Sequence, residues 1–216
     1  MRILGHIHTF NDEEVIDQSL QALLDQTYPV DEILVVDNDS TDKTLSRVFP
    51  DKVKIIRHGK NLGTSGAVIS GMKYALEHQF DWIWIFDADS APRKDALEKL
   101  VEFYQGLPPD LQTQIWLLAS LRVEAATQRK SSYELIFTPS GHQLVDHDQG
   151  KSFYEFDGTI WSASLYKLSA VQKLGLPSAD YVLDWGEYEY GYLGKRRGYR
   201  RQVFGLHGTV RISNAR

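Results

Sequence analysis

Acidic pairs of the form Asp-x-Asp are the residues in this sequence best suited to chemistry. Three such pairs occur: Asp37/Asp39, Asp87/Asp89 and Asp146/Asp148. The pair at Asp87 and Asp89 closes an apolar run, and carboxylate oxygens are the ligands that Mg²⁺ and Mn²⁺ prefer. We therefore expect a divalent metal there, which could neutralise charge on a departing diphosphate. Capping of the following helix is the alternative. We expect Asp146 and Asp148 to be solvated.

Two further segments suit a nucleotide with its phosphates. Asp37 and Asp39 also close an apolar run, and they could accept hydrogen bonds from a base or from ribose hydroxyls, with turn formation as the alternative. Asn61-x-Gly63-x-x-Gly66 then opens a helical pattern, where glycines admit a ligand to the backbone and the helix N-terminus favours an anion. A nicotinamide-cofactor fold is disfavoured because the first predicted strand is not followed by glycines.

A second acidic cluster lies late in the chain, at Asp184-Trp185-Gly186-Glu187-Tyr188-Glu189. A carboxylate beside a pocket can act as general base toward a hydroxyl. On a helix starting near Gly186, Glu187 and Glu189 would lie on different faces, so one could be catalytic and the other structural or exposed. The alternative is the ordinary enrichment of acidic residues in a first helical turn.

Histidine and serine offer weaker signals. His207 follows the last predicted strand, but a single His is more often structural than a ligand. We expect His6 and His8, inside the first strand, to be structural as well. The chain has no cysteine and no Gly-x-Ser-x-Gly elbow, which excludes thiolate chemistry and leaves the usual hydrolase triads without support.

Alternating strands and helices must position these residues. We predict strands over 3–9, 32–36, 53–57, 81–86, 115–121 and 199–204, and helices over 64–78, 96–104, 164–174 and 187–197. Asn11 with Glu14 predicts a capping box for a further helix, and Ser40 or Thr41 predicts the cap of a short helix through Phe49. This order indicates a mostly parallel sheet, whose ligands bind at the carboxyl ends of the strands. Four polar segments follow the ends of predicted strands, so we expect them on one rim of the sheet. They are 9–11, 37–39, 61–63 and 87–89.

Composition supports one soluble α/β domain over residues 1–216. Hydrophobic residues make up 42% of the chain and charged residues 25%, and the net charge of −5 argues against a nucleic-acid partner. No apolar run approaches the roughly 18 residues of a membrane span, and the N-terminus lacks a signal-peptide pattern, so we expect a cytoplasmic protein. The chain ends without a stop signal, so we expect a further C-terminal segment. We expect residues 122–156 to be a polar insert, irregular or antiparallel.

Taken in order, the motifs resemble an inverting family 2 glycosyltransferase with the GT-A fold. The matching segments are HTFND, VVDNDSTDKT, NLGTSGAVISG, IFDAD and DWGEYEYGYLGKRRGY. The last is similar to the branch of rhamnosyltransferases and galactofuranosyltransferases. The resemblance implies a Rossmann-like, mostly parallel central sheet flanked by helices. It also implies a nucleotide-sugar half over residues 1–121 and an acceptor half over residues 122–216.

Carried over position by position, the resemblance implies roles for the polar residues. The nucleotide-binding positions are Thr9, Asn11, Asp37, Asp39, Asn61, Gly63 and Asp87. Asp37 would contact a pyrimidine base and Asp39 the ribose. Asp87, Asp89 and His207 would hold Mn²⁺ or Mg²⁺.

The resemblance also implies a base and an acceptor site. Glu187 aligns with the catalytic base, which is usually Asp, so the assignment could slide to Asp184 or Glu189. Asp157, Trp161 and Trp185 would line the acceptor pocket. Ala163 stands where this branch has glycine, a change that could narrow the acceptor side.

The reaction implied is inverting transfer of a sugar from a UDP- or dTDP-sugar to a hydroxyl of a polysaccharide or lipid-linked glycan. Peripheral work at the inner face of a membrane is compatible with it, and the sequence does not fix the oligomeric state. One alternative is a sugar-phosphate nucleotidylyltransferase, which would need a glycine-rich basic loop after the first strand. The other is a catalytically silent nucleotide- or glycan-binding module.

Overall fold

The computed structural model describes the chain except for residues 126, 128–129, 132, 147–152, 182–184 and 212–216, and it describes only the backbone of 131 and 200–211. A central sheet runs through it in the strand order β10-β12-β6-β11-β4-β1-β2-β3. The first half is parallel: β1 (Ile3–Thr9) lies between β2 (Glu32–Asp37) and β4 (Trp82–Asp87), and β2 pairs with β3 (Val53–Arg57).

The second half of the sheet is mixed. Its strands are β5 (Ser90–Pro92), β6 (Ile115–Glu124), β7 (Lys130–Ser131), β10 (Phe153–Glu155), β11 (Ser164–Lys167) and β12 (Arg200–Arg211). Strand β11 runs antiparallel between β4 and β6, while β12 runs parallel to β6. Strands β8 (Leu135–Thr138) and β9 (Gly141–Leu144) form a separate antiparallel hairpin. The mostly parallel sheet with a small antiparallel insert confirms the predicted fold class.

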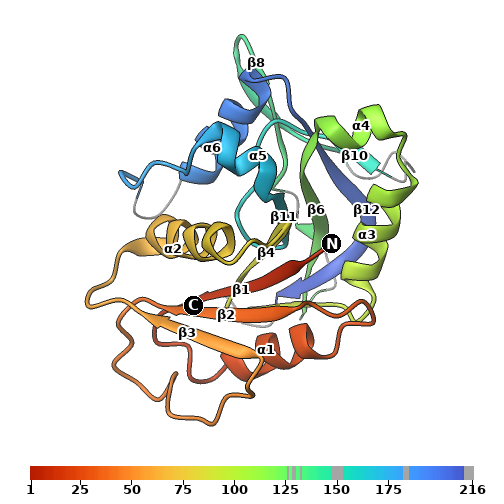
Figure 1. Cartoon of the computed structure of the whole chain (residues 1–216). Helices are drawn as coiled ribbons and strands as arrows, with labels where there is room; N and C mark the ends of the chain where they lie inside the picture. Colours follow the sequence, from red (N-terminus) through yellow and green to blue (C-terminus); the bar gives the residue numbers. More distant parts are fainter. Residues whose placement is uncertain (126, 128–129, 132, 147–152, 182–184, 212–216) are drawn as a thin grey trace.

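Helices cover both faces of the sheet, which explains why a strand such as β4 is apolar nearly throughout (Figure 1). The helices are α1 (Ile16–Leu24), α2 (Gly63–Glu77), α3 (Ala96–Gly106), α4 (Pro109–Gln114), α5 (Leu168–Leu174) and α6 (Gly186–Arg196). Apolar residues of α2, α5 and α6 share one core cluster, and those of α1 and α3 share the other. None of the described helices combines the length and the apolar character that a membrane crossing requires.

Helix α6 packs through one face that includes three glycines, Gly186, Gly191 and Gly194. Its buried positions include Glu187, Tyr190, Gly191 and Gly194, which follow the i, i+3, i+4, i+7 spacing of one helix face. A Cβ added at Gly194 would lie 2.4 Å from Cζ2 of Trp116, so the helix backbone sits directly on the core. This close approach fixes where the first turn of α6, with its acidic residues, is placed.

Three local predictions were wrong. Helix α1 begins at Ile16 without a side-chain cap, because the Asn11 side chain is used elsewhere. The described residues 40–49 form turns and bends, with no helix. Residues 164–167 form strand β11 in place of the first turn of the predicted helix, and α4 was not foreseen.

Candidate active site

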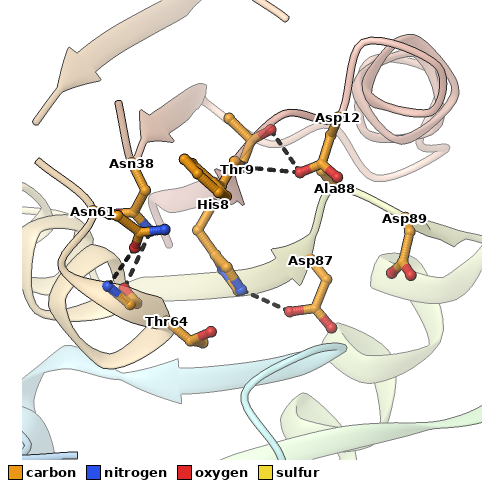
Figure 2. A pocket seen from close by; sticks show the side chains of 11 residues that line it. His8, Thr9, Asp12, Asn38, Asn61, Thr64, Asp87, Ala88 and Asp89 are labelled. Carbon is orange, nitrogen blue, oxygen red and sulfur yellow. Dashed lines mark hydrogen bonds and ion pairs between the residues drawn. The ribbon is translucent and has the colours of Figure 1, made fainter. Parts of the chain in front are cut away.

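The carboxyl ends of β1, β2 and β4 and the first turn of α2 enclose a pocket of about 300 Å³ (Figure 2). It is lined by His8, Thr9, Phe10, Asp12, Asn38, Asn61, Gly63, Thr64, Asp87, Ala88 and Asp89. The expected rim of polar groups is therefore present. It brings together Thr9, Asn61, Gly63, Asp87 and Asp89 from the predicted set.

His8 holds the Asp87 carboxylate. The parallel register of β1 and β4 sets the two residues opposite each other, and Nε2 of His8 lies 2.6 Å from Oδ1 of Asp87. Figure 2 shows the two side chains pointing toward one another. Burial acts to raise the pKa of Asp87, but the hydrogen bond from His8 and the nearby positive charge of Arg122 outweigh it and hold that pKa below its usual value. Asp87 is thus kept as an ionised oxygen donor.

A buried network also supports Asp87 from the other side. The backbone N–H of Asp87 donates to Oγ of Ser162 at 3.2 Å, and the Arg122 guanidinium donates to the Ser162 carbonyl. Arg122 in turn pairs with Glu134 at 3.3 Å, with side-chain exposures of 4% and 1%. The hydroxyl of Thr159 donates to the same Glu134 oxygen. The polar insert is therefore linked to the end of β4 that carries Asp87.

The loop after β1 is closed by its own side chains and joined to the loop after β2. Thr9 Oγ1 and the Phe10 N–H both donate to Oδ2 of Asp12 at 2.9 Å. Oδ1 of Asn11 accepts from the Thr41 N–H at 2.8 Å, with Asn11 at a φ of 57°. Asn11 therefore shapes the loop and is not among the residues that line the pocket, and its predicted nucleotide contact stays a prediction.

The segment Asn61–Gly63 is held by a neighbouring asparagine that the sequence analysis passed over. Nδ2 of Asn38 donates to the Gly63 carbonyl at 3.1 Å, and Oδ1 of Asn61 accepts from the Gly63 N–H at 2.8 Å. His58 lies behind Asn38, with Nδ1 2.9 Å from Asn38 Oδ1 and Nε2 2.9 Å from Ser70 Oγ. Burial lowers the pKa of His58, although the charge of Asp37 opposes the shift. A neutral ring therefore orients Asn38.

Asp37 is held by contacts within the protein. Its side chain is fully buried, accepts from the Ser40 N–H at 3.1 Å and lies 3.4 Å from Nε of Arg57. It is outside the pocket lining, so its contact with a base stays a prediction. Asp39 is 44% exposed and lies 3.7 Å from Arg57, outside the pocket lining, so its ribose contact stays a prediction.

The carboxylates of Asp87 and Asp89 fit a divalent cation. Both line the same pocket and supply hard oxygen donors, one of them held ionised by His8. No group of three or more His, Asp or Glu suited to a metal is present among the described residues. The backbone of His207 lies on β12 opposite Leu121, and its side chain is outside the description.

The predicted base, Glu187, stands on a helix whose first turn contacts the helix at the pocket wall. A Cβ at Gly186 would be 2.8 Å from Oγ of Ser65, so the first turns of α6 and α2 are in contact. Glu187 is 6% exposed on the inner face of α6, whereas Glu189 is exposed on another face, as the spacing predicted. Burial raises the pKa of Tyr188 to about 12, and the charge of Glu187 adds to the shift. Asp184 lies outside the described residues.

Two of the three expected acceptor residues are structural. Trp161 is 2% exposed and packs in the core with Tyr166 and Tyr190, so it cannot line an open pocket. Asp157 is buried, and its Oδ2 accepts from the Phe137 N–H at 2.8 Å and from Lys195 Nζ at 2.6 Å. Trp185 alone of the three is exposed, at 55%.

The sequence analysis missed His8, Phe10, Asp12, Asn38 and Thr64. His8 was interpreted as a strand histidine, although its place opposite Asp87 follows from aligning the two strand ends. Phe10 is 45% exposed. In the sequence, an aromatic residue between a strand and an Asn-Asp turn was the signal for a binding position. Asn38 lies between Asp37 and Asp39, whose carboxylates were the stronger candidates for binding.

Comparison with protein families decides the membership of the chain. The model for "Glycosyl transferase family 2" matches residues 6–174, which include the whole pocket. The chain belongs to glycosyl transferase family 2. The match covers β1 to α5 and so confirms the family-level resemblance in the motifs.

Curated relatives of this family 2 domain include plant polysaccharide enzymes. Glucomannan 4-beta-mannosyltransferase 9 of Arabidopsis thaliana is 30% identical over 186 residues, covering 80% of this chain and 34% of the relative. The uncharacterized protein MJ1222 of Methanocaldococcus jannaschii is 27% identical over 156 residues, covering 70% of this chain and 63% of that protein. The chain thus spans about a third of the length of the plant relative.

Solved structures show where the family 2 fold recurs. S. aureus TarS 1-349 in complex with UDP-GlcNAc matches with a TM-score of 0.73 at 16% identity, over 100% of this chain and 60% of that chain. GalNAc-T7 with UDP, GalNAc and Mn²⁺ matches with a TM-score of 0.78 at 13% identity, over 99% and 44%. At these identities the likeness is one of fold, and it confirms the GT-A-like architecture.

Proposed function

We propose that this domain transfers a sugar from a nucleoside diphosphate sugar to an acceptor hydroxyl, with inversion at the anomeric carbon. The observation that carries the proposal is the pocket in which Asp87 and Asp89 meet Thr9, Asn61 and Gly63 at the ends of parallel strands. Family membership supports it, as do the complexes of the structural neighbour TarS with UDP and with UDP-GlcNAc. We assign the donor to residues 1–121 and the acceptor to residues 122–216.

The pocket residues suit a nucleotide. The exposed ring of Phe10 offers a face on which a base would stack. The first turn of α2, opening at Gly63 and Thr64, presents backbone N–H groups that favour a diphosphate. Asn38 keeps this turn in place through the Gly63 carbonyl.

Asp87 and Asp89 would hold Mn²⁺ or Mg²⁺ against the diphosphate. A bound divalent cation supplies positive charge that stabilises the leaving diphosphate. His8 keeps Asp87 ionised and oriented for that purpose.

Glu187 would act as the general base. The acceptor oxygen forms a bond to the anomeric carbon while the bond from that carbon to the diphosphate oxygen breaks, and the diphosphate leaves with the electron pair. The acceptor proton passes to the Glu187 carboxylate. Its burial on the inner face of α6, next to α2, keeps it out of bulk water and near the donor half.

Calorimetric titration tests the donor site. We expect UDP or dTDP to bind in the presence of Mn²⁺ and much more weakly without it, with GDP as a purine comparison. Asp89→Ala should abolish the metal dependence. Mn²⁺-independent binding, or affinity unchanged in Asp89→Ala, would overturn the metal site. Transfer that persists in Glu187→Gln would overturn the base assignment.

The acceptor, the branch of the family and the location complete the proposal. The acceptor is a polysaccharide or a lipid-linked glycan, an assignment supported by the names of the plant relatives. Those relatives are mannosyltransferases, so the likeness of the Asp184–Tyr199 segment to rhamnosyl- and galactofuranosyltransferases stays a prediction. Cytoplasmic location at the inner face of a membrane is a prediction from the sequence alone.

A further inference from the structure

A second hollow, separate from the donor pocket, lies between α6 and the β8–β9 hairpin. Its volume is about 560 Å³, and we call it the aromatic groove. It is lined by Phe137, Thr138, Gly141, Tyr181, Trp185, Tyr188, Glu189 and Tyr192. Five of these side chains are aromatic.

Two of the five rings, Trp185 and Tyr192, are open to solvent in spite of their size. Trp185 is 55% exposed and Tyr192 is 46% exposed. Trp185 lies 5.6 Å from Tyr188 at a tilt of 54°, and Phe137 meets Tyr192 edge to face at 5.6 Å. Rings held at angles to one another present several separate apolar faces, which a flat protein-binding patch would not.

The two walls of the groove are fixed in place by buried contacts. Asp157 accepts from the backbone of Phe137 on β8 and from Lys195 on α6, so one carboxylate joins the walls. Tyr188 donates its hydroxyl to the Tyr133 carbonyl at 3.2 Å. A Cβ at Gly158 would lie only 2.8 Å from Cδ1 of Tyr188, so this ring packs against backbone. The groove is therefore preformed.

The position and charge of the groove indicate what it binds. Tyr188, Glu189 and Tyr192 stand on α6, the helix whose buried face carries the proposed base Glu187, so a molecule in the groove would lie along that helix. Glu189 is the one charged side chain among the lining residues, which disfavours a nucleic acid or an anionic lipid headgroup. Pyranose rings combine C–H faces that pack on aromatic rings with hydroxyls that bond to groups such as Glu189 and Thr138.

We propose that the aromatic groove binds the acceptor as a neutral glycan chain, contacting sugar units beyond the one that receives the new residue. This inference rests on the proposed function and extends its acceptor side from Trp185 to both walls of the groove. Phe137 and Tyr192, which meet edge to face, would contact one of these further sugar units, and Asp157 is a positioning residue that keeps the walls together.

Titration with linear β-1,4-linked manno- and gluco-oligosaccharides of two to six units tests the proposal, with and without saturating UDP and Mn²⁺. We expect affinity to rise with oligosaccharide length and to fall about tenfold in Tyr192→Ala and in Trp185→Ala. Trp185→Phe should retain most of the affinity. Phe153→Ala, which removes a 41% exposed aromatic outside the groove, is the matched control and should bind as the wild type does.

Each outcome separates this proposal from the proposed function. UDP titration of the same variants should be unchanged, which also shows that they are folded. If UDP binds and no oligosaccharide binds, or if both alanine variants bind as the wild type does, the groove proposal is wrong while the donor site stands. If oligosaccharides bind in the groove and no nucleotide binds, the transfer proposal fails and the groove stands. Loss of self-association in Tyr192→Ala without oligosaccharide binding would mark the groove as a contact between copies and overturn the proposal.

Discussion

Four non-glycine residues in or beside the proposed donor and acceptor regions have positive φ angles: Asn11 at 57°, Asp39 at 68°, Ala163 at 62° and Trp185 at 74°. Such backbone is strained for residues with a Cβ and persists where the surroundings fix it. Asn11 and Asp39 belong to the joined loops after β1 and β2, and Trp185 precedes the proposed base. The strained backbone therefore lies at or next to residues whose orientation the proposed site depends on.

Ala163 provides a test of this strain. It is fully buried, and its N–H donates to the Ile85 carbonyl at 2.8 Å, so its conformation is fixed by the sheet. Ala163→Gly should change the free energy of unfolding by less than about 1 kcal/mol, because relief of strain offsets the lost methyl group. Ala163→Val should destabilise by about 3 kcal/mol, through both φ and overpacking. Urea unfolding measures both, and a harmless valine would show that the strand end can relax.

His8 carries the second prediction at this scale. Loss of its contact with Asp87 should free the carboxylate to rotate and let its pKa rise toward the usual value. His8→Ala is expected to weaken Mn²⁺-dependent UDP binding by about tenfold or more, as other second-layer partners of metal ligands do. His78→Ala, which changes an exposed histidine directly after α2, is the control. Equal affinity of His8→Ala and wild type would contradict the role.

At the scale of elements, the packing of helix α6 fixes the position of the proposed base. Its first turn carries Glu187, and its buried stripe lies on Trp116 through Gly194. Gly194→Ala should force the helix outward, destabilising the fold by about 1–3 kcal/mol. It should also lower kcat while Mn²⁺-dependent UDP affinity stays within about twofold, because α6 lies outside the donor pocket. Gly106→Ala, at the open end of α3 with nothing near its Cβ, should leave both properties unchanged. A Gly194→Ala enzyme with normal kcat would show that the base is not positioned by this contact.

The elements best predicted from sequence are those whose pattern and burial agree. Strands β1 and β3 have the expected bounds, because buried parallel strands read as short apolar runs ended by polar residues. The helical spacing of the Ser164–Leu174 segment gave a wrong prediction for its first four residues. All four pair with β4 and three of them also pair with β6, and local spacing does not reveal such tertiary pairing. The capping box at Asn11 failed for a similar reason, since its side chain bonds to a loop 30 residues away.

The whole molecule decides which polar residues become a site. Sequence order placed Asp87, Asp89, Asn61 and Gly63 correctly, because strand ends of a parallel sheet share one edge. It could not show that Asp37 is buried or that Trp161 lies in the core, since both facts depend on which elements cover them. Nor could it reveal the aromatic groove, whose walls come from the β8–β9 hairpin and α6, about 50 residues apart in sequence.

Acid stability is the property that tests the packing of the whole fold. His6 is fully buried between β1 and α2, with Nε2 3.3 Å from the Ala67 carbonyl, and a Cβ at Gly71 would lie 2.3 Å from its ring. Burial, with a smaller contribution from His8, lowers the pKa of His6 from 6.5 to about 3. The unfolded chain therefore takes up a proton below pH 6.5 that the folded chain refuses until about pH 3.

Stability should accordingly be constant above about pH 7 and fall as the pH decreases through 6.5, by about 1.4 kcal/mol per pH unit from His6 alone. His58, whose pKa is also lowered, adds to the slope in the same direction. The carboxylates with lowered pKa values, such as Asp87, lose their contribution only below 3.8, so the interval from pH 4.5 to 7 isolates the histidines. Urea unfolding across that interval should show a shallower slope for His6→Leu, whatever its absolute stability. His78→Ala should keep the wild-type slope, because that side chain is exposed. Parallel wild-type and His6→Leu curves would mean that the core admits a charged His6, and that α2 does not seal the sheet at this point.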